Sequence, residues 1–143
     1  MKYKQLQLKN QLCFPLYACS KEIVKQYRPL LDKVGLTYTQ YITMMVLWEH
    51  ESLTVKELGR YLYLDSGTIT PLIKKLEKDN VVQRVRDTED ERKVYVHLTI
   101  KGKELQNRVK DIPFEVGSYV GLSDDEAKTL YELLYKILNN MSK

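Results

Sequence analysis

The side chains with the greatest intrinsic reactivity in this sequence are two thiols, Cys13 and Cys19. A thiolate attacks peroxides and disulfides, whereas a thiol packed on an apolar helix is usually an inert core residue. The two cysteines lie six residues apart in one predicted helix, which directs them to different faces and argues against a disulfide within the chain. Neither the two cysteines nor the two histidines stand at metal-ligand spacing, so we expect no metal and no cofactor.

Hydroxyl and basic side chains form a second chemically active group, in the middle of the chain. A predicted helix begins with small or hydrogen-bonding residues, namely Ser66, Gly67, Thr68, Thr70 and Pro71. Free N–H groups and the helix dipole attract phosphate at such a start. Basic residues follow on the helix and on the hairpin after it: Lys74, Lys75, Lys78, Arg84, Arg86, Arg92 and Lys93. A lysine-rich helix alone is equally well a solvated face, but the arginines directly after it favour DNA binding.

Three predicted helices must position this basic segment. Capping boxes begin at Thr37 and Thr54, each with Gln or Glu three residues later. Pro71 lacks an N–H and is tolerated in a first turn, so we expect regular hydrogen bonding to begin around Thr68. The predicted order is helix, helix, turn and helix, over residues 37–49, 55–62, 64–68 and 69–79.

The hydrophobic pattern then changes to a period of two, which is typical of strands. Residues 81–98 are predicted to form a hairpin with a polar tip, where Asp90 orients Arg92 toward a narrow minor groove. A helix over residues 100–110 should follow, with a break near Pro113. The last predicted helix begins at Ser123, which has a capping-box partner in Glu126.

The first and last predicted helices carry apolar faces that no other predicted element covers. The first helix should run over residues 8–34, with bends at Pro15 and Pro29, because proline removes a backbone donor and crowds the preceding turn. Both apolar faces therefore need a partner.

Length and composition fit one domain over residues 1–143. The net charge of +4 is only mildly suggestive of an anionic partner. No stretch approaches the roughly 20 apolar residues of a membrane span, so we expect a cytoplasmic protein with no membrane contact. The fold class we predict is mainly α (α+β): a winged helix-turn-helix whose DNA-binding lobe spans residues 37–110, with the wing at residues 81–98.

Three motifs resemble the MarR family of winged-helix regulators: residues 64–72 (LDSGTITPL), residues 90–92 (DER) and residues 98–102 (LTIKG). The resemblance spans nearly the whole chain. It implies a homodimer whose dimerisation helices are residues 1–34 and 112–143, bound to double-stranded DNA at a palindromic operator.

Within that family, residues 11–17 (QLCFPLY) and 35–41 (GLTYTQY) resemble the OhrR-like branch, which senses organic hydroperoxides and related oxidants. The resemblance implies that Cys13 is the redox-sensing thiol. It also implies that the phenols of Tyr27 and Tyr38 reach that sulfur from the partner subunit, with Tyr17 close by. Cys19 has no corresponding role, and Pro15 departs from the branch pattern.

Oxidation of Cys13 would begin as a sulfenic acid and continue to a mixed disulfide with a low-molecular-weight thiol or to higher oxides. Either product is bulkier and more polar than a thiol at a packed dimer joint. The resulting expectation is a repressor that oxidation switches off DNA, and not an enzyme.

Two other functions compete with this one. A MarR-type repressor released by a small aromatic or phenolic ligand would need a pocket between the dimerisation helices and the DNA-binding lobe. A thiol peroxidase using Cys13 would need an arrangement of arginine and threonine for peroxide activation, which the sequence does not show.

Overall fold

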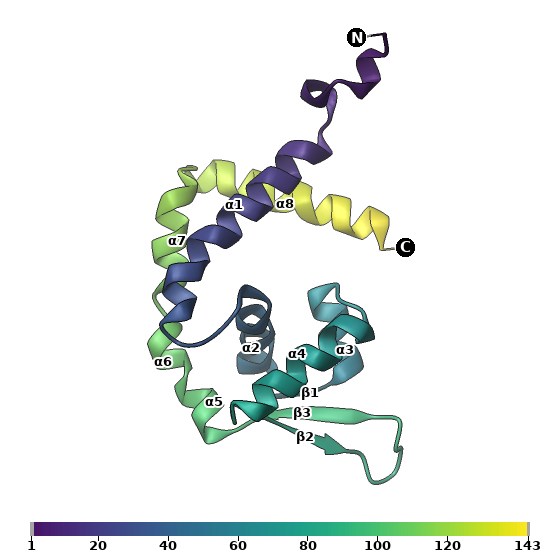
Figure 1. The fold of residues 1–143 in the computed structure, drawn as a ribbon, viewed down its shortest axis with the longest axis vertical. Helices are drawn as coiled ribbons and strands as arrows, with labels where there is room; N and C mark the ends of the chain where they lie inside the picture. The colour runs from purple at the N-terminus through teal and green to yellow at the C-terminus, as the bar shows by residue number, and fades with distance from the viewer. Residues whose placement is uncertain (1, 143) are drawn as a thin grey trace.

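The structure is a computed structural model and describes residues 2–142. Met1 and Lys143, the outermost residues of the two predicted dimerisation segments, lie outside the described residues. The chain folds into a lobe of helices and a small sheet, with a long N-terminal helix and two C-terminal helices extending from it (Figure 1). The mainly α winged helix-turn-helix predicted from the sequence is confirmed.

The first long helix is shorter than predicted. Two single turns of 3-10 helix, η1 (Lys4–Leu6) and η2 (Leu8–Asn10), precede α1 (Cys13–Asp32). Pro15 is the third residue of α1, where a backbone N–H has no partner within the helix, so the expected bend inside the helix is replaced by a helix start. Pro29 lies in the interior of α1 without ending it.

Side-chain caps fix the starts of the next two helices. Thr37 and Gln40 form the predicted capping box at α2 (Tyr38–His50). Thr54 caps α3 (Val55–Leu62) by accepting from the N–H of Glu57, 3.1 Å away. The Thr54 hydroxyl also donates to the Glu57 carboxylate at 3.0 Å, so the second box differs in detail from a reciprocal one.

The helix that carries the basic segment begins earlier than predicted. Helix α4 (Ser66–Lys78) has Asp65 as its N-cap, with Oδ1 accepting from the Thr68 N–H at 2.9 Å. Pro71 is therefore the sixth helical residue, beyond the first turn. The aspartate cap pulls the helix start into the stretch that we expected to be a turn.

The sheet contains one strand that the sequence did not reveal. Strands β2 (Val82–Arg86) and β3 (Val94–Leu98) pair as the predicted hairpin, with Gln83 opposite His97. Strand β1 (Ser52–Thr54) adds to the other edge of β3, giving the order β1-β3-β2.

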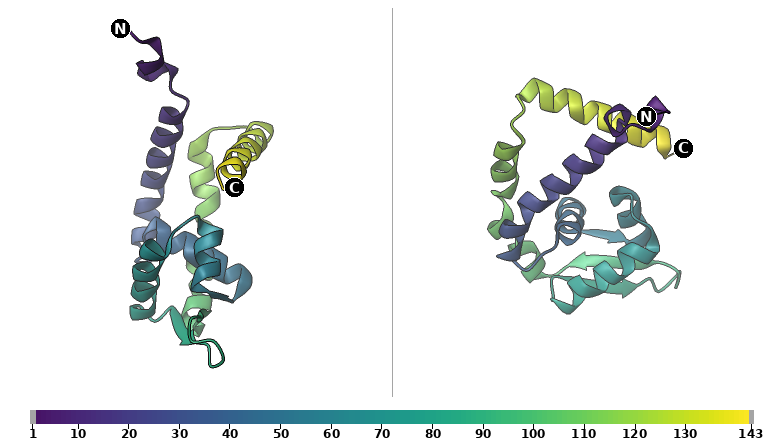
Figure 2. Two further views of the ribbon diagram at one scale, coloured as in Figure 1. Left: turned by 90° about the vertical axis from the view of Figure 1, so that its right-hand side faces the viewer. Right: turned by 45° about the horizontal axis from the view of Figure 1, so that its top comes forward.

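Four helices follow the sheet. Thr99 caps α5 (Ile100–Glu104) as predicted, and α6 (Gln106–Val109) continues after a single residue. Pro113 lies at the start of α7 (Ile112–Val120), so the expected break falls just before it. Ser123 and Glu126 form the predicted capping box of α8 (Asp124–Met141). Helix α7 packs along α1, whereas the turned view in Figure 2 separates α8 from α1.

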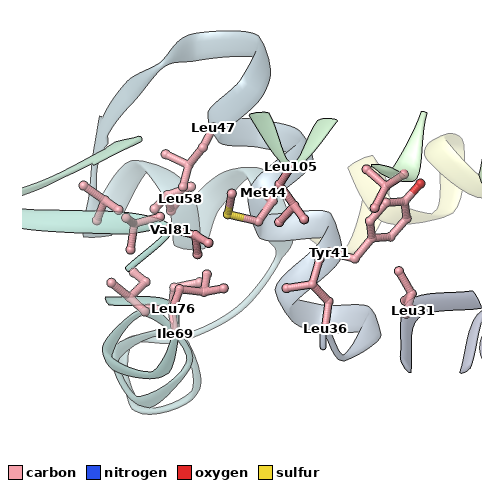
Figure 3. Close-up of a cluster of buried hydrophobic side chains, with 14 of the residues drawn as sticks. Leu31, Leu36, Tyr41, Met44, Leu47, Leu58, Ile69, Leu76, Val81 and Leu105 are labelled. Carbon is pink, nitrogen blue, oxygen red and sulfur yellow. The ribbon is translucent and has the colours of Figure 1, made fainter. Parts of the chain in front are cut away.

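The buried core reaches from Leu31 of α1 to Val116 of α7, and it explains why α4 has a fixed orientation. Met44 and Leu47 of α2 meet Leu58 of α3, Leu76 of α4 and Val81 in one buried cluster (Figure 3). All five side chains are buried, so apolar surface of three helices is removed from water in a single cluster. The opposite face of α4 remains open. None of the helices over residues 2–142 is both long and apolar enough to span a membrane.

Candidate functional site

A basic groove runs between α3, α4 and the wing. Its volume is about 790 Å³. Seven cationic side chains line it against two acidic ones, Glu57 and Asp90; the cations are Lys56, Arg60, Lys74, Arg84, Arg86, Arg92 and Lys93. Such an excess of positive charge on one face attracts a polyanion.

The leading end of α4 is open to solvent beside this groove. Ser66, Gly67, Thr68 and Pro71 are exposed, and Thr70 is half-buried and lines the groove. The exposed Lys74 and Lys75 follow one turn later. The buried face of the same helix is made by Ile69, Ile73 and Leu76, so the core turns the polar residues outward.

The wing tip presents an arginine that is held but still accessible. Arg92 donates through Nε to Oδ1 of Asp90 at 3.1 Å, while 91% of its side chain is exposed. Arg86 donates to the carbonyl of Glu91 across the hairpin. The carbonyl is neutral, so the charge of Arg86 stays uncompensated by that bond. Lys93 is exposed next to this pair.

Arg84 differs from the other basic residues of the wing. Its Nη2 lies 3.1 Å from Oε1 of Glu77 on α4, and its side chain is 34% exposed. Glu77 thus compensates the positive charge of Arg84, a residue that the sequence predicted to contact DNA.

Lys56 and Arg60 of α3 are groove residues that the sequence reasoning missed. Both are exposed and line the groove opposite the wing. The cap at Thr54 and the apolar positions of α3 do not identify them. Because the two residues are spaced i, i+4, they share one helix face, and that spacing was a usable signal.

Cys13 is the first residue of α1 and is exposed, as is Cys19. Both cysteines are free thiols. Tyr17 lies one turn after Cys13 on the same face and is also exposed. Tyr27 stands fourteen residues after Cys13, which corresponds to about 21 Å along a helix. The thiol therefore cannot contact Tyr27 of its own chain.

Three tyrosines gather where the other end of α1 meets α2. The Tyr27 ring centroid lies 4.9 Å from that of Tyr38 and 5.7 Å from that of Tyr41. Burial raises the pKa of Tyr38, and burial together with Tyr38 raises the pKa of Tyr27. Burial, reinforced by both neighbours, raises the pKa of Tyr41 to about 12. The phenols therefore remain protonated hydrogen-bond donors at neutral pH. Tyr41 is a member of this cluster that the sequence reasoning missed.

A cavity of about 610 Å³ adjoins these tyrosines. Tyr27, Tyr38 and Leu31 line one part of it, and the basic residues Lys21 and Arg28 line another. It lies between α1 and the start of α2, where a ligand-released repressor would need a pocket. Over residues 2–142, no group of three or more His, Cys, Asp or Glu residues is placed to hold a metal ion.

Large apolar side chains remain exposed on the long helices. On α8, the exposed fractions are 42% for Leu130, 53% for Leu133 and 36% for Ile137. Others lie on α1 and α7, among them Phe14, Ile23, Phe114 and Tyr119. Several large apolar side chains exposed on the same helices are a feature of interfaces between subunits.

Comparison with known proteins places these features in a family of regulators. Residues 25–109 match the family model of the transcriptional regulators SarA/Rot. The organic hydroperoxide resistance transcriptional regulator of Bacillus subtilis is 48% identical to the chain over 98% of this chain and 95% of that protein.

Solved structures of AbfR, from Staphylococcus epidermidis, share the fold. The reduced and the overoxidised protein, each bound to DNA, are 37% and 36% identical, with TM-scores of 0.80 and full coverage of both chains. The disulfide form of AbfR is 36% identical, covers 99% of this chain and 96% of that one, and gives a lower TM-score of 0.64. The arrangement of this chain is thus more similar to the DNA-bound forms than to the disulfide form.

Proposed function

The chain belongs to the SarA/Rot and OhrR-like regulators of the MarR family, and we propose that it represses transcription until Cys13 is oxidised. It is a DNA-binding regulator and not an enzyme. As a regulator of chromosomal DNA, it would act in the cytoplasm.

DNA binding uses the basic groove and the start of α4. Ser66, Thr68 and Thr70 enter the major groove, and Arg92 enters the adjacent minor groove. Arg60 and the three lysines that line the groove, Lys56, Lys74 and Lys93, contact phosphates. Two copies of the chain dimerise through residues 1–34 and 112–143 and therefore read a palindromic operator. The exposed apolar side chains of α1, α7 and α8 support this assignment.

The sensor is assembled from two subunits. The observation that carries this step is the separation, along α1, of the exposed Cys13 from the cluster of Tyr27, Tyr38 and Tyr41. If α1 of one subunit runs antiparallel beside α1 of the other, each thiol meets the partner's tyrosine cluster. The protonated phenols then donate hydrogen bonds to the thiolate and hold it for reaction.

The redox step is a two-electron oxidation of sulfur. The Cys13 thiolate attacks the distal oxygen of an organic hydroperoxide, forming an S–O bond as the O–O bond breaks. The alkoxide takes up a proton and leaves as an alcohol, and the cysteine becomes a sulfenic acid. A low-molecular-weight thiol then attacks that sulfur, forming a mixed disulfide and releasing water.

We propose that the mixed disulfide, rather than a higher oxide, is the product that releases DNA. Overoxidised AbfR was crystallised on DNA, and its TM-score to this chain equals that of the reduced complex. The disulfide form of AbfR is the one whose arrangement differs.

The test measures operator affinity by fluorescence anisotropy, using a duplex selected by the reduced protein from a random pool. Wild type, Cys13→Ser and Cys19→Ser are each treated with one equivalent of cumene hydroperoxide and a small thiol. Wild type and Cys19→Ser should lose affinity and recover it with dithiothreitol, while Cys13→Ser keeps it. Equal loss in all three proteins would exclude Cys13 as the sensor.

The cavity beside Tyr27 and Tyr38 favours a second candidate function, release by a small aromatic ligand. This function predicts that a phenolic compound such as salicylate lowers the operator affinity of Cys13→Ser as much as that of wild type. The thiol switch predicts no effect in either protein.

A further inference from the structure

Two hydrogen bonds and one further charged contact between Glu77 and Arg84 join α4 to β2, the first strand of the wing. Glu77 Oε2 accepts from the backbone N–H of Arg84 at 3.1 Å, and Oε1 accepts from Nε at 3.1 Å and lies 3.1 Å from Nη2. About a third of each side chain is exposed, 35% for Glu77 and 34% for Arg84. Because one bond is to the backbone, Glu77 fixes the path of β2 itself.

The charge of Arg84 is compensated within the protein. The backbone hydrogen bond from Arg84 lowers the pKa of Glu77, with the Arg84 side chain adding to it, so the carboxylate is ionised at neutral pH. Arg86, two residues later on the same strand, is bonded to a neutral carbonyl and is exposed. The two arginines can therefore be compared directly: Arg84 has a carboxylate partner, whereas the hydrogen bond of Arg86 is to a neutral carbonyl.

We propose that Glu77 and Arg84 are positioning residues for DNA recognition: their ion pair holds the wing against α4, and Arg84 neutralises no phosphate. This reassigns a residue that the sequence placed among the DNA contacts. The inference rests only on the DNA-binding half of the proposed function and is independent of Cys13.

Geometry gives the pair this importance. The start of α4 and the tip of the wing must reach neighbouring grooves of one duplex at the same time. Arg92 stands at the tip of the wing, and β1 pairs with β3 only over residues 95–97. The part of the wing beyond β1 is therefore a two-stranded ribbon, which is only marginally stable by itself. The ion pair of Glu77 with Arg84, the middle residue of β2, limits where Arg92 can go.

The first experiment uses salt to count phosphate contacts. Operator affinity of the reduced protein is measured between about 50 and 200 mM salt. The logarithm of the association constant falls linearly with the logarithm of the salt concentration, and each lost phosphate contact reduces the magnitude of this slope by about 0.9. Arg84→Gln should weaken binding but keep the wild-type slope, whereas Arg86→Gln should reduce the magnitude of the slope by about 1.8, because the dimer loses one phosphate contact in each subunit. Equal decreases in both variants would overturn the proposal.

The second experiment tests positioning by a double-mutant cycle. We expect Arg92→Ala to lower operator affinity about tenfold in wild type and by less than about threefold in Glu77→Gln. In the Glu77→Gln background the wing tip is displaced, so Arg92 contributes less binding energy before it is removed. The control background is Glu89→Gln, which removes an exposed wing carboxylate. Arg92→Ala should have its full effect there. The same tenfold loss in the Glu77→Gln background would refute a positioning role.

Stability is kept separate from positioning by two further measurements. Thermal unfolding of each reduced variant shows whether it is folded at the assay temperature. If Arg84→Gln does not fold, the double variant Glu77→Gln/Arg84→Gln, which removes both charges of the pair, replaces it and should also keep the wild-type slope, whereas a shallower slope would show that Arg84 contacts phosphate. A wild-type protein that fails to bind any DNA would refute the proposed function itself rather than this inference.

Discussion

The Arg108 guanidinium donates a hydrogen bond of 2.9 Å to the backbone carbonyl of Lys33, 75 residues earlier in the chain. Lys33 is the C-cap of α1, and Arg108 lies on α6. A few residues before Arg108, Thr99 donates to the carbonyl of Asn80 at 2.7 Å, and Lys101 donates to the carbonyl of Asp79 at 3.0 Å. The α5–α6 segment is therefore bonded to the end of α1 and to the end of α4.

This bridge leads to a prediction about coupling. Arg108→Leu removes the bond to α1, so we expect the ratio of oxidised to reduced operator Kd to fall several-fold, with about 1 kcal/mol lost in unfolding free energy. Lys110→Met, an exposed neighbour, is the control and should keep the wild-type ratio. Anisotropy titrations before and after oxidation measure both ratios. An unchanged ratio in Arg108→Leu would mean that the signal travels by another path.

The tyrosine cluster predicts the rate of thiol oxidation. Tyr38→Phe keeps the ring and removes one donor, and a hydrogen bond to a charged acceptor contributes about 1.5–3 kcal/mol, so we expect oxidation about tenfold slower or more. Tyr131→Phe on α8 should oxidise at the wild-type rate. Loss of free thiol under excess cumene hydroperoxide is the readout, in a Cys19→Ser background. Equal rates for all three proteins would remove the phenols from the sensor.

Alkaline pH should destabilise the protein through the same residues. Below pH 10 the Tyr41 phenol is neutral in both the folded and the unfolded chain; between pH 10.0 and about 12 the unfolded chain loses the proton first. Unfolding therefore becomes easier as the pH rises through this window. Urea titrations from pH 8 to 12 should show a smaller fall in unfolding free energy for Tyr41→Phe than for wild type. Parallel curves would contradict the assigned burial of this phenol.

Two glycines give opposite predictions for substitution by alanine. A Cβ on Gly102 would collide with the carbonyl of Val81, and the Gly102 carbonyl accepts from Trp48 Nε1 at 2.9 Å. Gly102→Ala should cost at least about 1–3 kcal/mol, the usual range for overpacking. A Cβ on Gly117, within α7, meets nothing within 4 Å, so Gly117→Ala should stabilise by about 0.5–1 kcal/mol. Thermal unfolding distinguishes them, and destabilisation of Gly117→Ala would show that a partner packs there.

Local signals in the sequence predicted the helix starts that have capping boxes, but not the starts of α1 and α4, and they predicted the sheet incompletely. The boxes at Thr37 and Ser123 depend on residues three positions apart, and both formed as predicted. Strand β1 has only three residues and exists because β3 offers it an edge, which is a long-range relationship. Pro15 misled because its effect depends on whether it stands inside a helix or in the first turn, and that boundary was placed too early.

The candidate site shows the same division. The basic residues of α4 and the wing follow from their spacing, but the charge partner of Arg84 is seven residues away on another element. Tyr41 shows no sequence sign that it joins Tyr27 and Tyr38, since that contact arises from how α1 packs on α2. Side chains brought together by tertiary packing had no local pattern to identify them.

Because Leu130 and Leu133 of α8 are exposed in the single chain, the stability of this protein should depend on its concentration. If a second copy covers them, folding gains free energy in proportion to the logarithm of protein concentration. A cell that makes few molecules would then hold a less stable regulator than one that makes many. The melting temperature of the purified chain should accordingly climb on going from nanomolar to micromolar solutions, so gene dosage would set the regulator's durability as well as its occupancy.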